Sequence, residues 1–246
     1  MKRTELIMGM PITVEIIGTN LTKHFETLFD YFKEVDARYS TYKPDSEISQ
    51  INNGLPEAKW TDEMRMVLAI CEKTRKDTKG YFNIKHKGKL DPSGLVKGWA
   101  INNAADMLRK TDISNFYIEA GGDIQVSGRD AEHRKWTVGI RNPFNIKEII
   151  KTISVTAEGI ATSGAYVRGQ HIYDPFHPDR AISRVESLTV IGENIFEADR
   201  YATAAYAMGE KGIGFIESTP GLEGYMVADD QLATYTSGFE RYVVSA

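Results

Sequence analysis

Cysteine is nearly absent from this chain. Cys71 is the single cysteine among 246 residues, so the chain cannot form an intrachain disulfide. It lies mid-chain among apolar residues at helical spacing, where it cannot be an N-terminal lipid anchor and where we expect a small buried hydrophobic side chain. No apolar run approaches the roughly 20 residues that a membrane-spanning helix needs, so we expect no transmembrane segment.

Excess positive charge is also missing. The 30 basic and 34 acidic residues give a formal net charge of −4, which offers no basic surface of the kind that binds nucleic acid. The first six residues soon become polar and lack the apolar core of a signal peptide, so we expect a cytoplasmic protein. An exported form whose signal has been removed is the alternative.

Several common catalytic signatures do not occur. The sequence contains no GxSxG, no GxxxxGK[ST] and no GxGxxG, which removes the usual hydrolase, P-loop and dinucleotide-binding hypotheses. The five histidines do not pair at the spacing of a zinc motif such as HExxH, and one cysteine provides no thiolate cluster. We therefore expect no zinc site.

Hydrophobic periodicity predicts helices and strands that are interspersed along the chain. Asn20, Ser46 and Thr61 stand where helix caps are expected. The predicted helices cover residues 20–39, 47–53, 61–80, 92–100, 195–209 and 213–218. The predicted strands cover residues 7–17, 116–120, 124–126, 136–140, 149–155, 187–192, 225–228 and 232–236. Because helices and strands do not alternate strictly, we expect one compact α+β domain over residues 1–246 rather than a doubly wound sheet.

The most informative stretch is residues 90–100, LDPSGLVKGWA. Asp91 is a residue type that caps helices, Pro92 suits the first helical position, and the following apolar residues have helical spacing. Gly94 permits close approach to the backbone, and Lys97 places an ammonium one turn into the helix. Free amides and this ammonium favour a phosphate, whereas the Asp91 carboxylate favours a sugar hydroxyl, a ring N–H or a metal. An ordinary capped helix with a surface lysine would have the same pattern.

The helix predicted over residues 195–209 consists mostly of small residues and should pack closely against another element. Asp199 and Thr203 are four residues apart and share one of its faces. A carboxylate and a hydroxyl are hard oxygen ligands that suit Mg²⁺ better than zinc, with water, a carbonyl or substrate phosphates completing the coordination. The alternative is that Asp199 only favours the helix dipole while Thr203 bonds back to the Asp199 carbonyl.

His171 is the histidine with the clearest catalytic potential. Small polar residues precede it and Asp174 follows three residues later, so a carboxylate could orient the imidazole as a general base near neutral pH. A hydrogen-bonded loop histidine would have the same neighbours. Tyr42 lies on a polar loop, residues 40–47, either as a stacking platform for a ligand or as a surface aromatic.

Taken in order, these motifs resemble the FAD:protein FMN transferases, the ApbE-like family, also described as thiamine-biosynthesis lipoproteins. The resemblance runs from about Met8 to Gly209, which is most of the chain. Seven motifs carry it: Met8-Gly9, residues 40–48 (STYKPDSEI), residues 91–98 (DPSGLVKG), residues 121–123 (GGD), residues 161–164 (ATSG), His171 with Asp174-Pro175, and Asp199 with Thr203.

The resemblance implies an ApbE-like, T-fold-like domain in which antiparallel-rich sheets pack against helices. It implies cleavage of the FAD pyrophosphate, attachment of FMN to a Thr or Ser hydroxyl of a target flavoprotein, and release of AMP. Mg²⁺ would sit on the pyrophosphate, held by Asp199, Thr203 and the backbone oxygen of Gly94, and His171 would assist the acceptor hydroxyl. The residues implied to line the FAD pocket are Met8, Tyr42, Tyr81, Phe82, Asn83, Asp91, Lys97 and His171.

Four features depart from the family pattern. There is no N-terminal lipobox, and Ala202 stands where many members have a second acid. Residues 176–179 (FHPD) replace the common continuation after Asp174-Pro175, and the segment between Tyr81 and Leu90 is short. Two other activities fit the same pocket: a Mg²⁺-dependent FAD pyrophosphatase that gives FMN and AMP, and a non-catalytic FAD-binding or storage protein.

Overall fold

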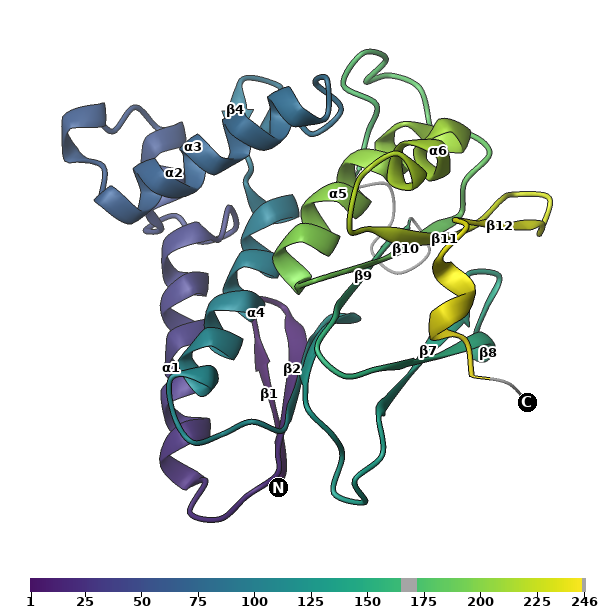
Figure 1. Ribbon diagram of the computed structural model, residues 1–246. Helices are drawn as coiled ribbons and strands as arrows, with labels where there is room; N and C mark the ends of the chain where they lie inside the picture. Colours follow the sequence, from purple (N-terminus) through teal and green to yellow (C-terminus); the bar gives the residue numbers. More distant parts are fainter. Residues whose placement is uncertain (165–171, 245–246) are drawn as a thin grey trace.

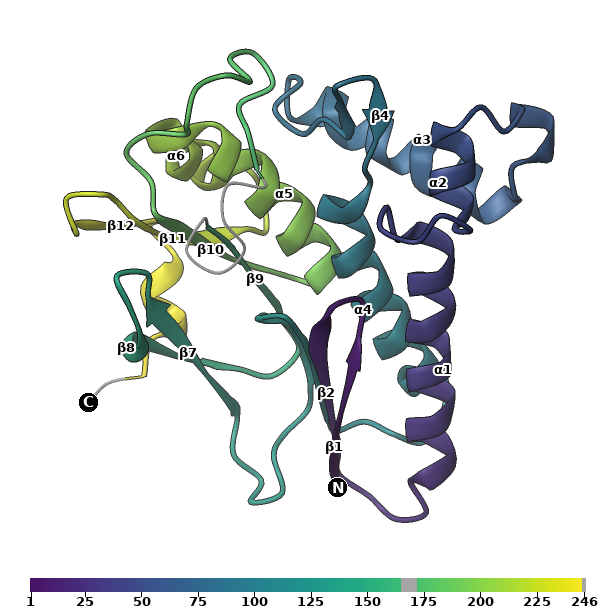
Figure 2. The same cartoon turned by 180° about the vertical axis from the view of Figure 1, so that it is seen from behind.

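Residues 1–164 and 172–244, which the computed structural model describes, contain a long antiparallel sheet with helices packed on one of its faces (Figures 1 and 2). The strands are β1 (Lys2–Ile7), β2 (Met10–Ile16), β3 (Lys85–His86), β4 (Lys89–Leu90), β5 (Phe116–Ala120), β6 (Asp123–Ser127), β7 (Trp136–Asn142), β8 (Asn145–Val155), β9 (Gly159–Gly164), β10 (Ser187–Gly192), β11 (Glu223–Val227) and β12 (Ala233–Tyr235). The main sheet has the order β1-β2-β5-β6-β9-β10-β11-β12, and β3–β4 and β7–β8 form separate hairpins.

The helices cover one face of this sheet from β1 to β11. They are α1 (Thr22–Tyr39), α2 (Glu47–Asn52), α3 (Asp62–Asp77), α4 (Ser93–Arg109), α5 (Ile195–Ala207) and α6 (Gly212–Glu217), with single 3₁₀ turns at Glu57–Lys59, Gly209–Lys211 and Phe239–Tyr242. Helices α4 and α5 lie side by side against the sheet, and α1 packs on the outer side of α4 (Figure 1). The α+β class predicted from the interspersed elements is confirmed.

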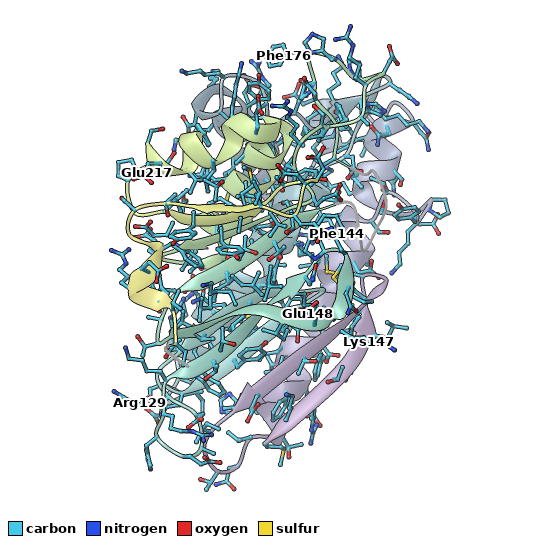
Figure 3. All side chains as sticks on the ribbon, turned by 90° about the vertical axis from the view of Figure 1, so that its right-hand side faces the viewer. Arg129, Phe144, Lys147, Glu148, Phe176 and Glu217 are labelled. Atoms are coloured by element: carbon cyan, nitrogen blue, oxygen red, sulfur yellow. The ribbon has the colours of Figure 1, made fainter. Side chains whose placement is uncertain are left out.

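The middle of the sheet is buried on both faces, because a second layer covers part of the side opposite the helices. Along β5, Phe116 and Ile118 point into the core beneath the helices, as alternate residues of a strand must share one face. Along β6, Ile124 and Val126 instead face the β7–β8 hairpin and the C-terminal 3₁₀ turn, where they pack in a smaller apolar cluster that includes Phe239. Figure 3 shows Phe144 and Glu148 on the outer part of that hairpin.

Local patterns predicted several elements correctly. The strands at residues 116–120 and 187–192 have the predicted bounds. Ser46 caps α2 by accepting the amide of Ser49, and Thr61 caps α3 by accepting the amide of Met64. Both caps are hydroxyl side chains directly before an apolar helical face, which is the pattern that predicted them.

The first strand was predicted only in part: Ile12, Val14 and Ile16 do share the buried face of one strand, β2. Residues 7–17 were expected to form one strand with Met8-Gly9 at its start, but β1 and β2 form a hairpin and Met8-Gly9 is the two-residue turn between them. Met8 has φ 57° and Gly9 has φ 71°, the left-handed pair that suits the twist of a tight hairpin. Leu21, not Asn20, is the residue before α1, and it makes no side-chain cap hydrogen bond.

The central helix also begins one residue later than predicted. Pro92 precedes α4 instead of starting it, while the Asp91 carboxylate accepts the amide of Ser93 at 3.0 Å. Residues 159–164 were given no element and form β9, a central strand of the sheet. Among the described residues, none of the helices combines the length and the apolar character needed to cross a bilayer.

Candidate active site

A cavity of about 740 Å³ lies between helices α4 and α5 and two segments of the chain, residues 81–87 and 172–182. Its floor is formed by the first turns of α4 and by the inner face of α5, with Thr162 and Ser163 from β9 beside them. One wall is residues 81–87, which include β3, and a second wall comes from residues 172–182. This volume is typical of a pocket for a substantial organic ligand.

The floor depends on the close approach of α4 and α5. The amide of Gly98 donates to the Asp199 carboxylate at 2.8 Å between N and Oδ2, and both groups are buried. A Cβ atom at Gly98 would lie 2.6 Å from Asp199 Cβ, so only glycine allows this spacing. The many alanines predicted to pack closely are buried in this part of α5, which confirms that prediction.

One turn away along both helices, Gly94 meets Thr203. The Thr203 hydroxyl lies 3.4 Å from the Gly94 carbonyl oxygen and donates to it. A Cβ atom at Gly94 would lie 3.2 Å from Thr203 Cγ2, so a larger residue would push the two helices apart. The residue pairs Gly94–Thr203 and Gly98–Asp199 therefore repeat the same glycine-to-polar contact at a spacing of one helical turn.

A buried cluster of charges lies beneath this contact. Lys97 Nζ is 2.5 Å from Asp123 Oδ2 and 3.9 Å from Asp199 Oδ1, so one ammonium faces two carboxyls. Burial raises the pKa of Asp199 from its usual 3.8 to about 8; the Lys97 ammonium opposes the rise and the Asp123 carboxyl adds to it. Asp123 is 1% exposed, so its ion pair with Lys97 lies inside the protein. The cluster is thus one positive charge short of neutral when both carboxyls are ionised.

Strand β6 positions this cluster. Asp123 and Gln125 are two residues apart, so both side chains face the helices. The Gln125 amide oxygen accepts the amide of Ile195 at 2.8 Å, and its nitrogen donates to the Ala157 carbonyl at 2.8 Å. The first amide of α5 therefore donates to a buried side chain of the sheet. This hydrogen bond fixes the start of α5 and so the position of Asp199 one turn later.

The two walls of the cavity are connected. The Tyr173 hydroxyl donates to the carbonyl oxygens of Asn83 at 3.1 Å and Lys85 at 3.3 Å, and its ring centroid lies 4.3 Å from that of His86. On the outer side, the Tyr81 ring meets Phe176 edge to face, with centroids 5.0 Å apart. Figure 3 shows Phe176 at the outer end of the molecule, above the sheet.

The structure brings together most of the residues that the sequence singled out. Eight of them line this one cavity: Tyr81, Phe82, Asn83, Asp91, Gly94, Lys97, Asp199 and Thr203. Met8 and Tyr42 do not line it; Met8 is the partly buried hairpin turn, and the Tyr42 side chain is 96% exposed. His171 lies outside the described residues.

The donors on the floor fit a hard divalent cation. A carboxylate, a hydroxyl and a backbone carbonyl from Asp199, Thr203 and Gly94 line one cavity, and oxygen ligands of these three kinds are those that Mg²⁺ prefers. The surplus negative charge beside Lys97 also favours a cation. Across residues 1–164 and 172–244, no three His, Cys, Asp or Glu side chains come together as a metal site. An ion here would therefore need water or ligand oxygens to complete its shell.

The sequence pattern did not predict two features of the site. Asp123 was recorded only as part of a glycine-containing motif, because an acid in a strand interrupted by glycines gives no sign that it is buried against Lys97. Lys85, Lys87 and Arg180 line the mouth of the cavity and were not singled out. The run of alternating lysines at residues 85–89 was the available signal for them.

Known proteins resemble this chain in sequence. A sequence model described as the ApbE family matches residues 8–88 and 84–226. A protein of Vibrio cholerae serotype O1 named FAD:protein FMN transferase is 33% identical over 131 residues, which is 50% of this chain and 39% of that relative. The chain therefore spans less than half of that relative's length.

Solved structures share the whole fold. The ApbE protein of Thermotoga maritima has a TM-score of 0.87 at 19% identity, with 100% of this chain and 99% of that chain covered. The flavin transferase ApbE of Vibrio cholerae has a TM-score of 0.87 at 21% identity, with 98% of each chain covered. At these identities the likeness establishes the fold.

Proposed function

Since the chain belongs to the ApbE family, we propose that it is a Mg²⁺-dependent FAD:protein FMN transferase. It would cleave the diphosphate of FAD, attach FMN to a Thr or Ser hydroxyl of an acceptor flavoprotein, and release AMP. The relative named above carries this activity in its name. The observation that supports the proposal is the meeting of Gly94, Asp199 and Thr203 on the floor of one cavity.

The cation site is the first part of the proposed mechanism. Asp199, Thr203 and the Gly94 carbonyl would hold Mg²⁺, which when bound would neutralise charge on the diphosphate oxygens. In a regular helix the Gly98 amide would donate to the Gly94 carbonyl, but here this amide also has the Asp199 carboxylate as acceptor. Competition for that donor leaves the Gly94 oxygen more available to a cation.

The remaining residues orient the nucleotide. Lys97 presents an ammonium at the cavity floor, where it would attract the diphosphate and disfavour displacement of that group toward solvent. Tyr81 and Phe82 provide aromatic surface on one wall, and Asn83 provides an amide beside them. Phosphoryl transfer depends mainly on such positioning and on charge neutralisation, so this arrangement suits it.

The proposed transfer exchanges one phosphorus–oxygen bond for another. The acceptor hydroxyl oxygen forms a bond to the phosphorus of the FMN phosphate, and the bond from that phosphorus to the bridging oxygen breaks. The electron pair stays with the bridging oxygen, which leaves as part of AMP. The hydroxyl proton is lost to a base, and His171 is the proposed base for this step. A base of suitable pKa contributes about 10²- to 10⁴-fold to such reactions.

Incubation with FAD, MgCl₂ and a flavoprotein that carries a candidate Thr or Ser site tests this proposal. We expect FMN covalently attached to the acceptor by mass spectrometry, with one AMP released for each FMN attached. Release of free FMN and AMP at the same rate without acceptor would instead identify an FAD pyrophosphatase. Retention of intact FAD under all conditions would identify a binding protein and contradict both enzymatic proposals.

The Asp199→Ala variant tests the assigned cation site. Loss of one group that stabilises transition-state charge lowers turnover by roughly 10²- to 10³-fold, and we expect a reduction of at least this size. Asp229→Ala, at an exposed position, is the matched control and should retain full turnover. Unchanged Mg²⁺-dependent turnover in the Asp199 variant would remove Asp199 from the site.

A further inference from the structure

Positive charge is distributed unevenly within the cavity. Lys97, at the floor, is paired with Asp123 and Asp199. Lys85, Lys87 and Arg180 also line the cavity, but their side chains are exposed and make no ion pair with any residue that the structure describes. These three residues, called here the cationic rim, come from two segments that line the cavity. Two exposed carboxylates, Asp91 and Asp179, also line the cavity, so the three cations leave a local excess of one positive charge in a chain whose net charge is −4.

The cationic rim lies on structured segments. Lys85 and His86 pair with Leu90 and Lys89 across the β3–β4 hairpin, and Lys87-Gly88 is its two-residue turn, with φ of 48° and 79°. This left-handed pair is the conformation of a tight hairpin turn, so Lys87 is held at the tip.

Both sides of the rim are tied to their surroundings. Asn52 clamps the hairpin from α2, since its side chain accepts the Leu90 amide at 2.7 Å and donates to the Leu90 carbonyl at 2.9 Å. The Tyr173 hydroxyl bonds to the carbonyls of Asn83 and Lys85, so it ties the wall that carries Arg180 to the wall that carries the lysines. Both segments are therefore held beside the same cavity, which all three cations line.

We propose that Lys85, Lys87 and Arg180 form a phosphate subsite for the leaving nucleotide, AMP. The proposal rests on the function proposed above. When the phosphorus of the FMN phosphate bonds to the acceptor oxygen, the broken bond leaves its electron pair on the AMP phosphate, which gains negative charge. The carboxyls of Asp123 and Asp199 lie at the floor, so without a bound cation the floor cannot stabilise that charge. Cations at the mouth can, and a guanidinium can bind two phosphate oxygens at once.

The position at the mouth also suits a product that has to leave. Exposed charge pairs are weakened by solvent and salt, so each contributes only up to about fivefold in affinity. Three of them together would bind an AMP phosphate at least tenfold more tightly than a neutral rim, yet would still release it.

Calorimetric binding of AMP and adenosine, with MgCl₂ present, tests the subsite without any need for turnover. For the triple variant Lys85→Gln, Lys87→Gln, Arg180→Gln we expect the Kd of AMP to rise about tenfold while the Kd of adenosine is unchanged. Arg180→Gln alone should give about a third to a half of that change on a logarithmic scale. Lys89→Gln is the matched control, because Lys89 lies in the same hairpin, is exposed and does not line the cavity.

Salt dependence adds a second readout. Between 50 and 300 mM NaCl, AMP binding should weaken in the unmodified chain and in Lys89→Gln, but much less in the triple variant. An unchanged Kd for AMP in the triple variant overturns the subsite. So does a triple variant that binds AMP normally but needs more acceptor for FMN transfer, because the rim would then recognise the acceptor protein. If AMP binding depends on the rim but no FMN is transferred to any acceptor, the proposed function fails and the subsite stands.

Discussion

The Gly98 amide donates a 2.8 Å hydrogen bond to the Asp199 carboxylate, although the two residues are 101 positions apart in the chain. This bond joins α4 to α5 at the floor of the cavity and orients the carboxylate toward Lys97. Since a Cβ atom at Gly98 would lie 2.6 Å from Asp199 Cβ and 2.9 Å from the Ile195 carbonyl oxygen, the bond requires glycine.

Gly98→Ala should therefore separate the two helices. Forcing extra atoms into a packed contact destabilises proteins by about 1–3 kcal/mol, and we expect a loss in this range by urea denaturation together with loss of Mg²⁺-dependent turnover. Gly214→Ala is the control, because Gly214 lies within α6 and a Cβ atom there would meet nothing within 4 Å. That variant should be as stable as the parent or slightly more stable. Equal stability of the two variants would contradict the close contact.

The raised pKa of Asp199 predicts how the stability of the metal-free protein changes with pH. The pKa is about 8 in the folded chain and 3.8 in the usual unfolded environment, so between these values the folded state holds a proton that the unfolded state has released. The free energy of unfolding should then fall as pH rises from about 4 to about 8. Asp199→Asn removes the titrating group, keeps an acceptor for Gly98, and should flatten this dependence.

Chemical denaturation in EDTA at several pH values measures this effect, with Asp229→Asn as a control that should keep the parent slope. Mg²⁺ requires the ionised carboxylate, so calorimetry near pH 7 should also detect proton release on Mg²⁺ binding. A parent protein whose stability does not change between pH 5 and pH 8 would show that Asp199 is already ionised.

Local sequence was sufficient for elements whose own pattern contains the information. The α3 helix has a capping hydroxyl at Thr61 and inward residues such as Met64 and Val67 at helical spacing, and it begins where predicted. The β10 strand is rich in apolar and β-branched residues, is buried throughout, and was also predicted with its observed bounds. In both cases the residues that form the element also identify it.

Elements that depend on distant partners were missed. The β9 strand consists mostly of small and polar residues, because α5 packs directly on it. A Cβ atom at Gly159 would lie 2.0 Å from the Ile195 nitrogen. The β1 strand is mostly charged and polar, since it is an edge strand whose outward residues meet solvent. Neither strand shows the apolar alternation that identifies a strand in isolation.

In the candidate site too, local spacing predicted some residues, while others depend on long-range packing. Asp199 and Thr203 could be paired from their spacing on one helix, and Asp91, Gly94 and Lys97 from theirs on another. That the two sets meet, and that Asp123 joins them from β6, depends on how the helices pack on the sheet. The family resemblance predicted that these segments form one site, whereas residue spacing alone could not.

Buried Arg200 anchors α5 to α3. Its guanidinium donates to Thr74 Oγ1 at 3.0 Å and to Glu197 Oε2 at 2.6 Å, and it lies 4.4 Å from the ring centroid of Tyr201. Arg200→Met keeps the bulk but loses these charged hydrogen bonds, which contribute about 1.5–3 kcal/mol each, so we expect a loss of about 2–3 kcal/mol in the free energy of unfolding.

A double-mutant cycle with Thr74→Val, measured by urea denaturation, should give a coupling of about 1 kcal/mol between the two side chains. Arg75→Met is the control, because Arg75 is exposed and pairs with Glu72 within the same helix; its stability should change little. Additive effects of Arg200→Met and Thr74→Val would show that the two residues do not interact across α3 and α5.

Two variants of Thr203 distinguish packing at the cavity floor from metal binding by its hydroxyl. Thr203→Val keeps the branched side chain that packs against Gly94, whereas Thr203→Ser keeps the hydroxyl that lies 3.4 Å from the Gly94 carbonyl. If that hydroxyl binds Mg²⁺, the valine variant should need at least about tenfold more Mg²⁺ for half-maximal AMP release, because one oxygen ligand is lost. The serine variant should stay within about threefold of the parent, since packing without the methyl group changes but the ligand remains. Titration of AMP release against Mg²⁺ concentration decides between the two roles: a serine variant that is impaired while the valine variant is not would mean that Thr203 serves only to pack the two helices together.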